Sequence, residues 1–170
     1  MKRLILLRHA KSDWDAPYDA DHARPLASRG EHAAAAIGRA LALARQIPDL
    51  AITSSARRAR TTVDIAAAAG DWDCPIQATD DLYGASPGDA IRLVNRADDD
   101  VDRLLLAGHE PTWSHLAAIL TGGGRFQMKT ATALAVDFDI ATWDRAEPGA
   151  GAAAWMLNPR LFTDGDFDLS

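Results

Sequence analysis

A histidine and an arginine stand side by side at the end of an apolar run near the start of the chain. Residues 4–7 are aliphatic, and Arg8 and His9 follow them directly. An imidazole can attack phosphorus through an unprotonated nitrogen when an acceptor, often a backbone carbonyl, holds the proton on the other nitrogen. A neighbouring guanidinium offers a planar fork of donors that matches phosphate oxygens. The pair therefore predicts phosphoryl transfer to His9.

Two further stretches follow apolar runs in the same way. Residues 54–62 read SSARRARTT and contain Arg57, Arg58 and Arg60, while residues 107–111 read AGHEP and contain His109. Nearby arginines lower the pKa of a histidine and stabilise the charge on the phosphoryl oxygens during transfer. The helices expected to begin within these stretches would add the favourable field of their amino ends. Together the three stretches predict a phosphate site.

Strand patterns and helix patterns alternate through the first two thirds of the chain. Strands are predicted at residues 3–7, 50–53, 75–78, 103–107, 132–140 and 152–158. Helices are predicted at residues 28–46, 55–69, 87–97 and 111–121. This order predicts an α/β three-layer sandwich, with a mostly parallel central sheet, helices on both faces and an added strand pair near the end. Ligands bind at the carboxyl ends of such strands, so the three stretches should meet at one edge.

Local signals refine the expected boundaries of these elements. Ser28 with Glu31 resembles a capping box, which predicts a helix beginning at that point. Gly70 is expected to stop the second helix. Gly108 is expected to place His109 on a tight turn before a helix that starts at a proline.

Composition restricts the classes of protein that the chain can belong to. The 170 residues are expected to form one domain, 1–170, and carry a formal charge of −6. That charge gives no support to nucleic-acid binding, and it makes the arginine cluster more informative. Cys74 is the only cysteine, and the apolar run after Met1 is too short for a signal peptide or a membrane span. A cytoplasmic location without a membrane partner is therefore expected.

Four motifs resemble those of a known family. LLRHAKS, RPLASRG, SSARRARTT and GHEP occur in this order within residues 2–120, as in the histidine phosphatase superfamily and especially its short SixA-type phosphohistidine phosphatases. The resemblance implies a phosphoglycerate mutase-like fold and a phosphoenzyme on His9. It implies that Arg8 and Arg58 hold the phosphate, with Arg58 counted from Ser54, and that His109 binds the phosphoryl oxygens. No metal and no cofactor are implied.

The chain departs from the family pattern at the proton donor. Larger members carry a glutamate in the loop after the third strand, but this loop reads TDDLYGASPGD. Asp81 is the nearest candidate, either as the donor or as a solvated carboxylate. Arg24 either reaches the rim of the phosphate pocket or pairs with the acidic residues 13–21. Ala27 and Ser55 stand where many relatives have threonine and proline, so any hydroxyl contact at Ala27 is lost.

The leading hypothesis is a metal-independent phosphatase that forms a phosphohistidine intermediate and dephosphorylates phosphohistidine on a protein. A phosphoramidate leaves easily, which suits a site without a strong acid. Short connections leave the expected pocket open, which favours a protruding substrate on a phosphorylated protein. A small phosphorylated substrate, hydrolysed as a phosphomonoester, is the alternative within the family. A non-catalytic phosphate-binding module is the alternative outside enzymes, because a fold does not fix a function.

Overall fold

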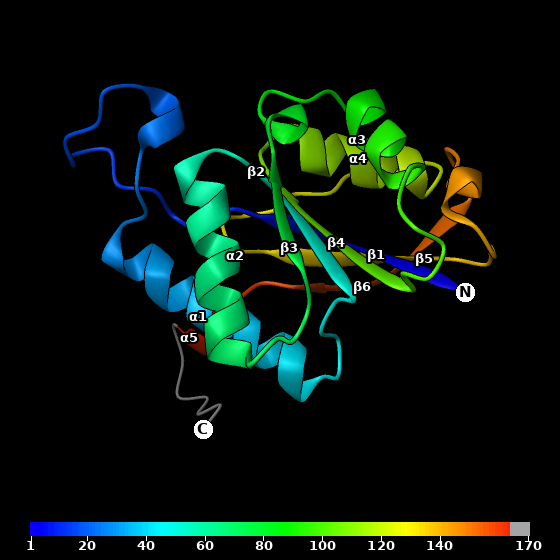
Figure 1. Ribbon diagram of the computed structural model, residues 1–170, viewed down its shortest axis with the longest axis horizontal. Helices are drawn as coiled ribbons and strands as arrows, with labels where there is room; N and C mark the ends of the chain where they lie inside the picture. The colour runs from blue at the N-terminus through cyan, green and yellow to red at the C-terminus, as the bar shows by residue number, and fades with distance from the viewer. Residues whose placement is uncertain (164–170) are drawn as a thin grey trace.

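One mixed sheet forms the middle layer of the protein, and helices cover both of its faces (Figure 1). The computed structural model describes residues 1–163. The strands are β1 (Lys2–Arg8), β2 (Leu50–Ser54), β3 (Ile76–Thr79), β4 (Arg103–Gly108), β5 (Ala133–Phe138) and β6 (Gly151–Leu157). The helices are α1 (Ser28–Leu43), α2 (Arg57–Gly70), α3 (Pro87–Val94), α4 (Thr112–Leu120) and α5 (Arg160–Thr163).

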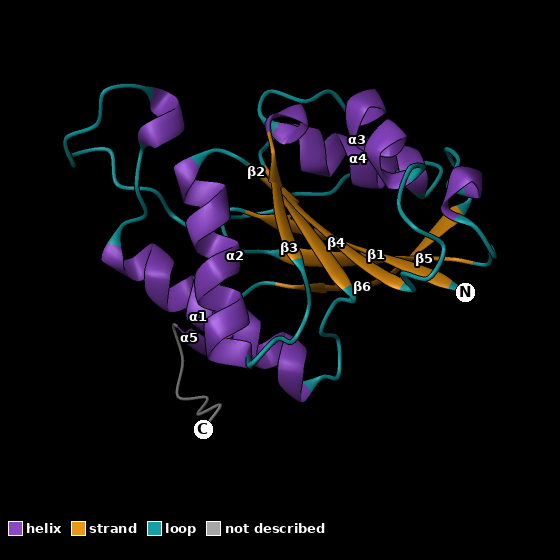
Figure 2. Cartoon of the chain, viewed as in Figure 1, coloured by secondary structure: helices purple, strands orange, loops and turns teal. Residues whose placement is uncertain are grey.

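The strand order is β3-β2-β4-β1-β5-β6. β3, β2, β4 and β1 run parallel to their neighbours, whereas β5 pairs antiparallel with β1 and with β6. This arrangement confirms the predicted three-layer α/β fold with an added antiparallel pair (Figure 2). Since β2, β4 and β1 are adjacent, their carboxyl ends lie side by side. Within the described residues, no helix has the length and apolar character needed to cross a membrane.

The continuous apolar run of β1 results from burial on both faces of the sheet. Leu4 and Leu6 pack into the cluster that includes α3 and α4, while Ile5 and Leu7 pack into the cluster that includes α1 and α2. All four side chains are fully buried. Successive side chains of a strand point to opposite faces, so a central strand between two helical layers must be apolar at every position.

Backbone packing, rather than the predicted capping box, fixes the start of α1. Ser28 is the first helical residue, and the N-cap is Ala27, whose side chain cannot cap. The Ala27 N–H donates to the Lys11 carbonyl at 2.9 Å. A Cβ on Gly30 would lie 2.1 Å from the same carbonyl oxygen, so only glycine fits there. The RPLASRG motif thus packs the first turn of α1 against the segment that follows His9.

Two glycines end regular elements: Gly70 stops the second helix as predicted, whereas Gly108, predicted to lie in a tight turn, is the last residue of a strand. Gly70 is the last residue of α2, and Asp71 takes the left-handed conformation, with φ 52°. Gly108 is the last residue of β4, and a Cβ there would lie 2.7 Å from Cζ2 of Trp113. The Trp113 Nε1–H donates to the Leu7 carbonyl at 2.8 Å. Gly108 therefore makes room for an indole that ties α4 to β1.

Candidate active site

The carboxyl ends of β1, β2 and β4 border a pocket of about 220 Å³. It is lined by Arg8, His9, Lys11, Ser12, Trp14, Arg24, Arg58, His109, Glu110 and Thr130. Five of the six residues that the sequence singled out therefore lie together, although they come from four separate segments. We call this cavity the phosphate pocket. The sixth residue, Asp81, does not line it.

His9 is held in one orientation at the base of the phosphate pocket. Its backbone N–H donates to the Gly108 carbonyl at 3.0 Å, and its Nδ1 lies 2.7 Å from the Ala10 carbonyl oxygen. A carbonyl only accepts, so Nδ1 carries the proton and Nε2 keeps its lone pair. Burial lowers the pKa of His9 to about 3; the Ala10 carbonyl opposes this, and the charges of His109 and Arg58 add to it. The ring is therefore neutral at pH 7.

Thr62, the last residue of SSARRARTT, connects the end of β1 to α2. Its side chain is fully buried. The Ala10 N–H donates to Thr62 Oγ1 at 3.0 Å, and the same hydroxyl donates to the Arg58 carbonyl at 2.6 Å. These two bonds set the position of the backbone after His9 relative to the backbone of Arg58.

The arginines of the pocket are anchored by acceptors outside it. Arg58 Nη1 donates to the Asp21 carbonyl at 2.7 Å, and Arg58 Nη2 lies 3.0 Å from Asp21 Oδ2. Arg24 Nη2 donates to Asp21 Oδ1 at 2.8 Å. Arg8 Nη1 donates to the Met128 carbonyl at 2.8 Å. Arg24 thus pairs with Asp21 of the acidic loop and also lines the pocket.

The sequence pointed to Asp21 only as one of the acidic residues 13–21 and did not predict that it would hold two arginines of this site. Burial acts to raise the pKa of Asp21, but the hydrogen bond from Arg24 and the charge of Arg58 outweigh it and lower the pKa. The carboxylate therefore stays ionised and holds two arginines at once. The spacing of Asp21 and Arg24, three residues apart around the short 3₁₀ turn Asp21–Ala23, was the available signal.

His109 lies between the ends of β1 and β2. Its Nε2 is 2.9 Å from Ser54 Oγ, and its ring centroid is 5.2 Å from that of His9. Burial lowers the pKa of His109 to about 4, and the charge of Arg58 contributes to this shift. Both imidazoles are therefore neutral at pH 7, and the arginines supply the positive charge of the pocket.

Asp81 lies apart from the phosphate pocket. It is exposed, its backbone N–H donates to Thr79 Oγ1 at 3.1 Å, and it borders another cavity together with Arg96. The carboxylate that does line the phosphate pocket belongs to Glu110, which the sequence did not single out. Across residues 1–163, no three histidine, cysteine, aspartate or glutamate side chains form a group that could hold a metal ion.

The chain belongs to the histidine phosphatase superfamily, since the sequence model of branch 1 of that family matches residues 4–118. An uncharacterised protein of Mycobacterium tuberculosis strain H37Rv is 36% identical over 163 residues, which cover 91% of this chain and 100% of that protein. A chloroplastic protein of Arabidopsis thaliana is 30% identical over 172 residues, which cover 96% of this chain and 78% of that protein.

Solved structures agree with this family. A crystal structure from Agrobacterium tumefaciens, provisionally assigned as the phosphohistidine phosphatase SixA, has a TM-score of 0.77 and 27% identity, and the match covers 93% of this chain and 98% of that one. The protein histidine phosphatase SixA bound to tungstate has a TM-score of 0.74 and 20% identity, with 92% and 97% covered. The predicted resemblance to SixA-type proteins is confirmed, and the family supports a phosphatase activity.

Proposed function

We propose that this protein is a metal-independent phosphatase that transfers the phosphoryl group of a protein phosphohistidine to His9 and then to water. The observation that carries the proposal is the fixed, neutral imidazole of His9, whose Nδ1 is bound to the Ala10 carbonyl inside a pocket lined by three arginines. The arginines supply the positive charge that a metal provides in other phosphatases.

In the first step, the lone pair of His9 Nε2 forms a bond to phosphorus while the bond from phosphorus to the substrate nitrogen breaks. The other ring nitrogen of the substrate imidazole has taken up a proton from solvent, so the electron pair leaves with a neutral imidazole. Arg8 and Arg58 stabilise the charge on the phosphoryl oxygens. His109 donates to one of these oxygens through Nδ1–H, provided that the Ser54 hydroxyl donates to its Nε2, at 2.9 Å.

In the second step, water attacks the phosphorus of phosphorylated His9. The bond from phosphorus to Nε2 breaks, and its electron pair returns to Nε2. One water proton stays on the phosphate, and the other is released to solvent. The substrate imidazole is a good leaving group, so the chemistry does not require Asp81, which lies outside the phosphate pocket.

Access to His9 favours a substrate that protrudes. The side chain of His9 is 9% exposed, so a phosphoryl group must enter the pocket to meet it. A phosphorylated histidine on the surface of a protein can place its phosphoryl group there. A protein partner of this kind implies a cytoplasmic location, and the single cysteine of the chain is compatible with it.

The test is to trap the phosphoenzyme with a ³²P-labelled phosphohistidine peptide, quench in alkali and map the labelled residue. We expect the label on His9, and we expect turnover to persist in excess EDTA. A parallel assay compares this peptide with phosphoserine and sugar phosphate substrates at equal concentration, and we expect the phosphohistidine peptide to react fastest.

Each arm can refute a different part of the proposal. Label on another residue would refute the covalent route through His9. Loss of turnover in EDTA that a single divalent ion restores would refute metal independence. Faster turnover of a phosphomonoester would assign the same site to small phosphorylated substrates, and no turnover of any substrate would leave a phosphate-binding module.

A further inference from the structure

A second cleft adjoins the phosphate pocket and is lined by cations. Its volume is about 160 Å³, and its lining includes Lys11, Arg29, Thr130 and Arg160. Lys11 and Thr130 also line the phosphate pocket, so the two cavities share a wall. We call this second cavity the basic cleft. Three cationic side chains thus gather beside the phosphate pocket in a protein whose formal charge is −6.

The backbone places these cations together. The Lys11 carbonyl accepts from the Ala27 N–H and lies against Gly30, so the loop after β1 is pressed onto the first turn of α1. Arg29 belongs to this turn, and α5, which carries Arg160, packs against α1 (Figure 1). The closeness of Lys11 and Arg29 therefore follows from the glycine of the RPLASRG motif.

The cations of the basic cleft have no carboxylate partner within residues 1–163. None of the ion pairs in this part of the chain involves Lys11, Arg29 or Arg160. Glu31 is two positions from Arg29, which turns it by about 200° to the opposite face of α1, and it does not line the cleft. In contrast, Arg24 and Arg58 of the phosphate pocket share the carboxylate of Asp21.

We propose that the basic cleft is a second anion subsite, which binds a carboxylate or phosphate group of the substrate while the transferred phosphoryl group occupies the phosphate pocket. The proposal rests on the proposed function, because it takes the phosphate pocket as the place of reaction. For a phosphoprotein, the second group is an acidic side chain near the phosphohistidine. Lys11, which borders both cavities, faces both anions.

The charge of the basic cleft would select among substrates. Partly exposed ion pairs each change affinity by about two- to fivefold, and they act on association rates as well. Three such pairs would give a substrate with a neighbouring acidic residue an advantage of about tenfold over a neutral one. The advantage should fall as salt rises, because the cleft is open to solvent.

The experiment measures the binding of peptides to the His9→Ala variant. Because binding needs no turnover, a failure of this proposal can be distinguished from a failure of the proposed catalysis. Two fluorescent peptides carry the same non-hydrolysable phosphonate analogue of phosphohistidine, flanked in one by two glutamates and in the other by two glutamines. We expect the glutamate peptide to bind about tenfold more tightly, and we expect Arg29→Ala with Arg160→Ala to reduce this preference to about twofold or less. Fluorescence anisotropy at two salt concentrations gives both the preference and its salt dependence.

Arg39→Ala is the matched control, because Arg39 is an exposed arginine of the same helix that does not line the cleft. This variant should keep the full preference. With His9 restored, Arg29→Ala with Arg160→Ala should hydrolyse p-nitrophenyl phosphate within about twofold of the unmodified rate, since that substrate has no second anion. A similar loss for both peptides would indicate a structural defect and would overturn the proposal.

A second pair of ligands separates the possible sources of the anion. Butane-1,4-diol bisphosphate and butyl phosphate compete with the neutral peptide for His9→Ala. One outcome is that the bisphosphate binds more tightly than butyl phosphate only when Arg29 and Arg160 are present, while the glutamate peptide has no such advantage over the glutamine peptide. In that case the subsite stands and its ligand is a small molecule. If neither the glutamate peptide nor the bisphosphate binds more tightly than its partner without the second anion, the basic cleft is not a subsite.

Discussion

The phosphate pocket and the loop of residues 11–27 that borders it are built in different ways. His9 and His109 follow strands whose backbones pair residue by residue, and the His9 N–H itself bonds to the Gly108 carbonyl. The loop reaches the body of the protein through the side chains of Asp21 and His22, which contact Arg58 and Ser55, and through the backbone of Lys11. In it, Trp14 is 61% exposed and rests on the guanidinium of Arg24, 3.5 Å from the ring centroid.

This difference separates the chemistry from the selection of substrates. A nucleophile must lie within a few tenths of an ångström of its attack position, and paired strand ends provide such rigidity. Side chains of a surface loop can change without moving the strands beneath them. We therefore expect changes at the strand ends to affect every substrate, and changes in the loop, including the side chains that it contributes to the pocket, to affect substrates differently.

The largest effect is expected for His9→Ala. Removal of a nucleophile costs orders of magnitude, so turnover should fall by about a hundredfold or more with every substrate. The fold should remain, since His9 follows a strand whose core positions are leucine and isoleucine. Turnover of p-nitrophenyl phosphate and a thermal melt measure the two quantities. A residual rate above about a hundredth of the original would be inconsistent with the covalent route.

A second prediction concerns the point where the loop meets the body of the protein. Gly30→Ala would place Cβ 2.1 Å from the Lys11 carbonyl oxygen, so the loop or α1 must shift. Such overpacking should lower the free energy of unfolding by about 2 kcal/mol. Gly88→Ala, early in α3, meets no atom closer than 3.6 Å and should be neutral or stabilising. Denaturant melts compare the variants, and equal stability would show that the contact at Gly30 is unimportant.

The sequence predicted the strand-end pocket far better than the loop. Arg8, His9, Arg58 and His109 could be placed together because parallel strands end at one edge, and topology alone brings such ends together. Asp81 was chosen by its place after the third strand, but the direction of a loop residue depends on contacts that no periodicity records. For the same reason, neither the basic cleft nor the bridging role of Asp21 was predicted.

The predicted start of α1 at Ser28 is confirmed, but the predicted reason for it, a capping box, is wrong. Ser28 carries the residues of a capping box, yet α1 begins there through a backbone contact to Lys11, sixteen residues before Ala27. A capping box does form at α3, between Ser86 and Asp89. The short helix α5 was also missed, because four residues carry too little periodicity to predict a helix.

A third prediction follows from the buried, neutral state of His9. Its folded pKa of about 3 lies below the unfolded value of 6.5, so the unfolded chain binds more protons between these values. Stability should therefore fall as the pH drops below 6.5. His9 should contribute about 2 kcal/mol of this loss between pH 7 and pH 5.

His9→Asn isolates that contribution, because asparagine does not titrate. Denaturant melts of both chains at pH 7 and pH 5 should show the smaller loss in the variant. The carboxylates, which also titrate on acidification, are common to the two chains and cancel in the difference. An equal loss in both chains would mean that His9 is already protonated in the folded protein.

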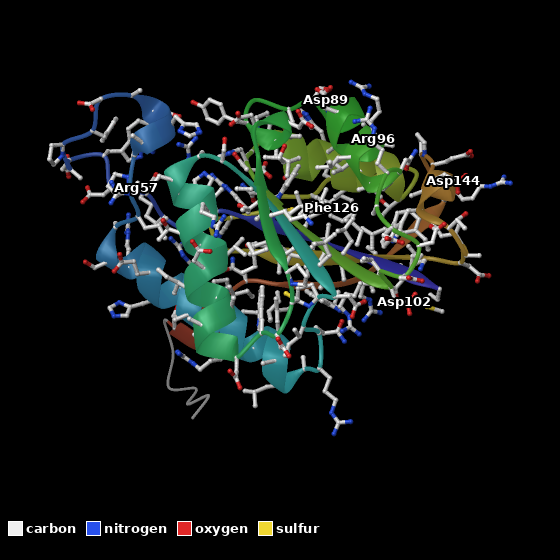
Figure 3. The ribbon with its side chains drawn as sticks, in the orientation of Figure 1. Arg57, Asp89, Arg96, Asp102, Phe126 and Asp144 are labelled. Carbon is white, nitrogen blue, oxygen red and sulfur yellow. The ribbon has the colours of Figure 1, made fainter. Side chains whose placement is uncertain are left out.

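The smallest effect is expected at Arg58, where the two regions meet, since this arginine belongs to the pocket but is held by Asp21 of the loop. Arg58→Lys keeps the charge and removes the planar fork that binds Asp21 and phosphate together. We expect kcat/KM to fall about tenfold, equivalent to roughly 1.4 kcal/mol of transition-state stabilisation. Arg57→Lys should leave kcat/KM unchanged within about twofold, because Arg57 is exposed at the amino end of α2 (Figure 3), whereas Arg58 is buried. If Arg57 proved the more sensitive of the two, the phosphate would have to bind on the outer side of α2, and the pocket between the strand ends would not be the active site.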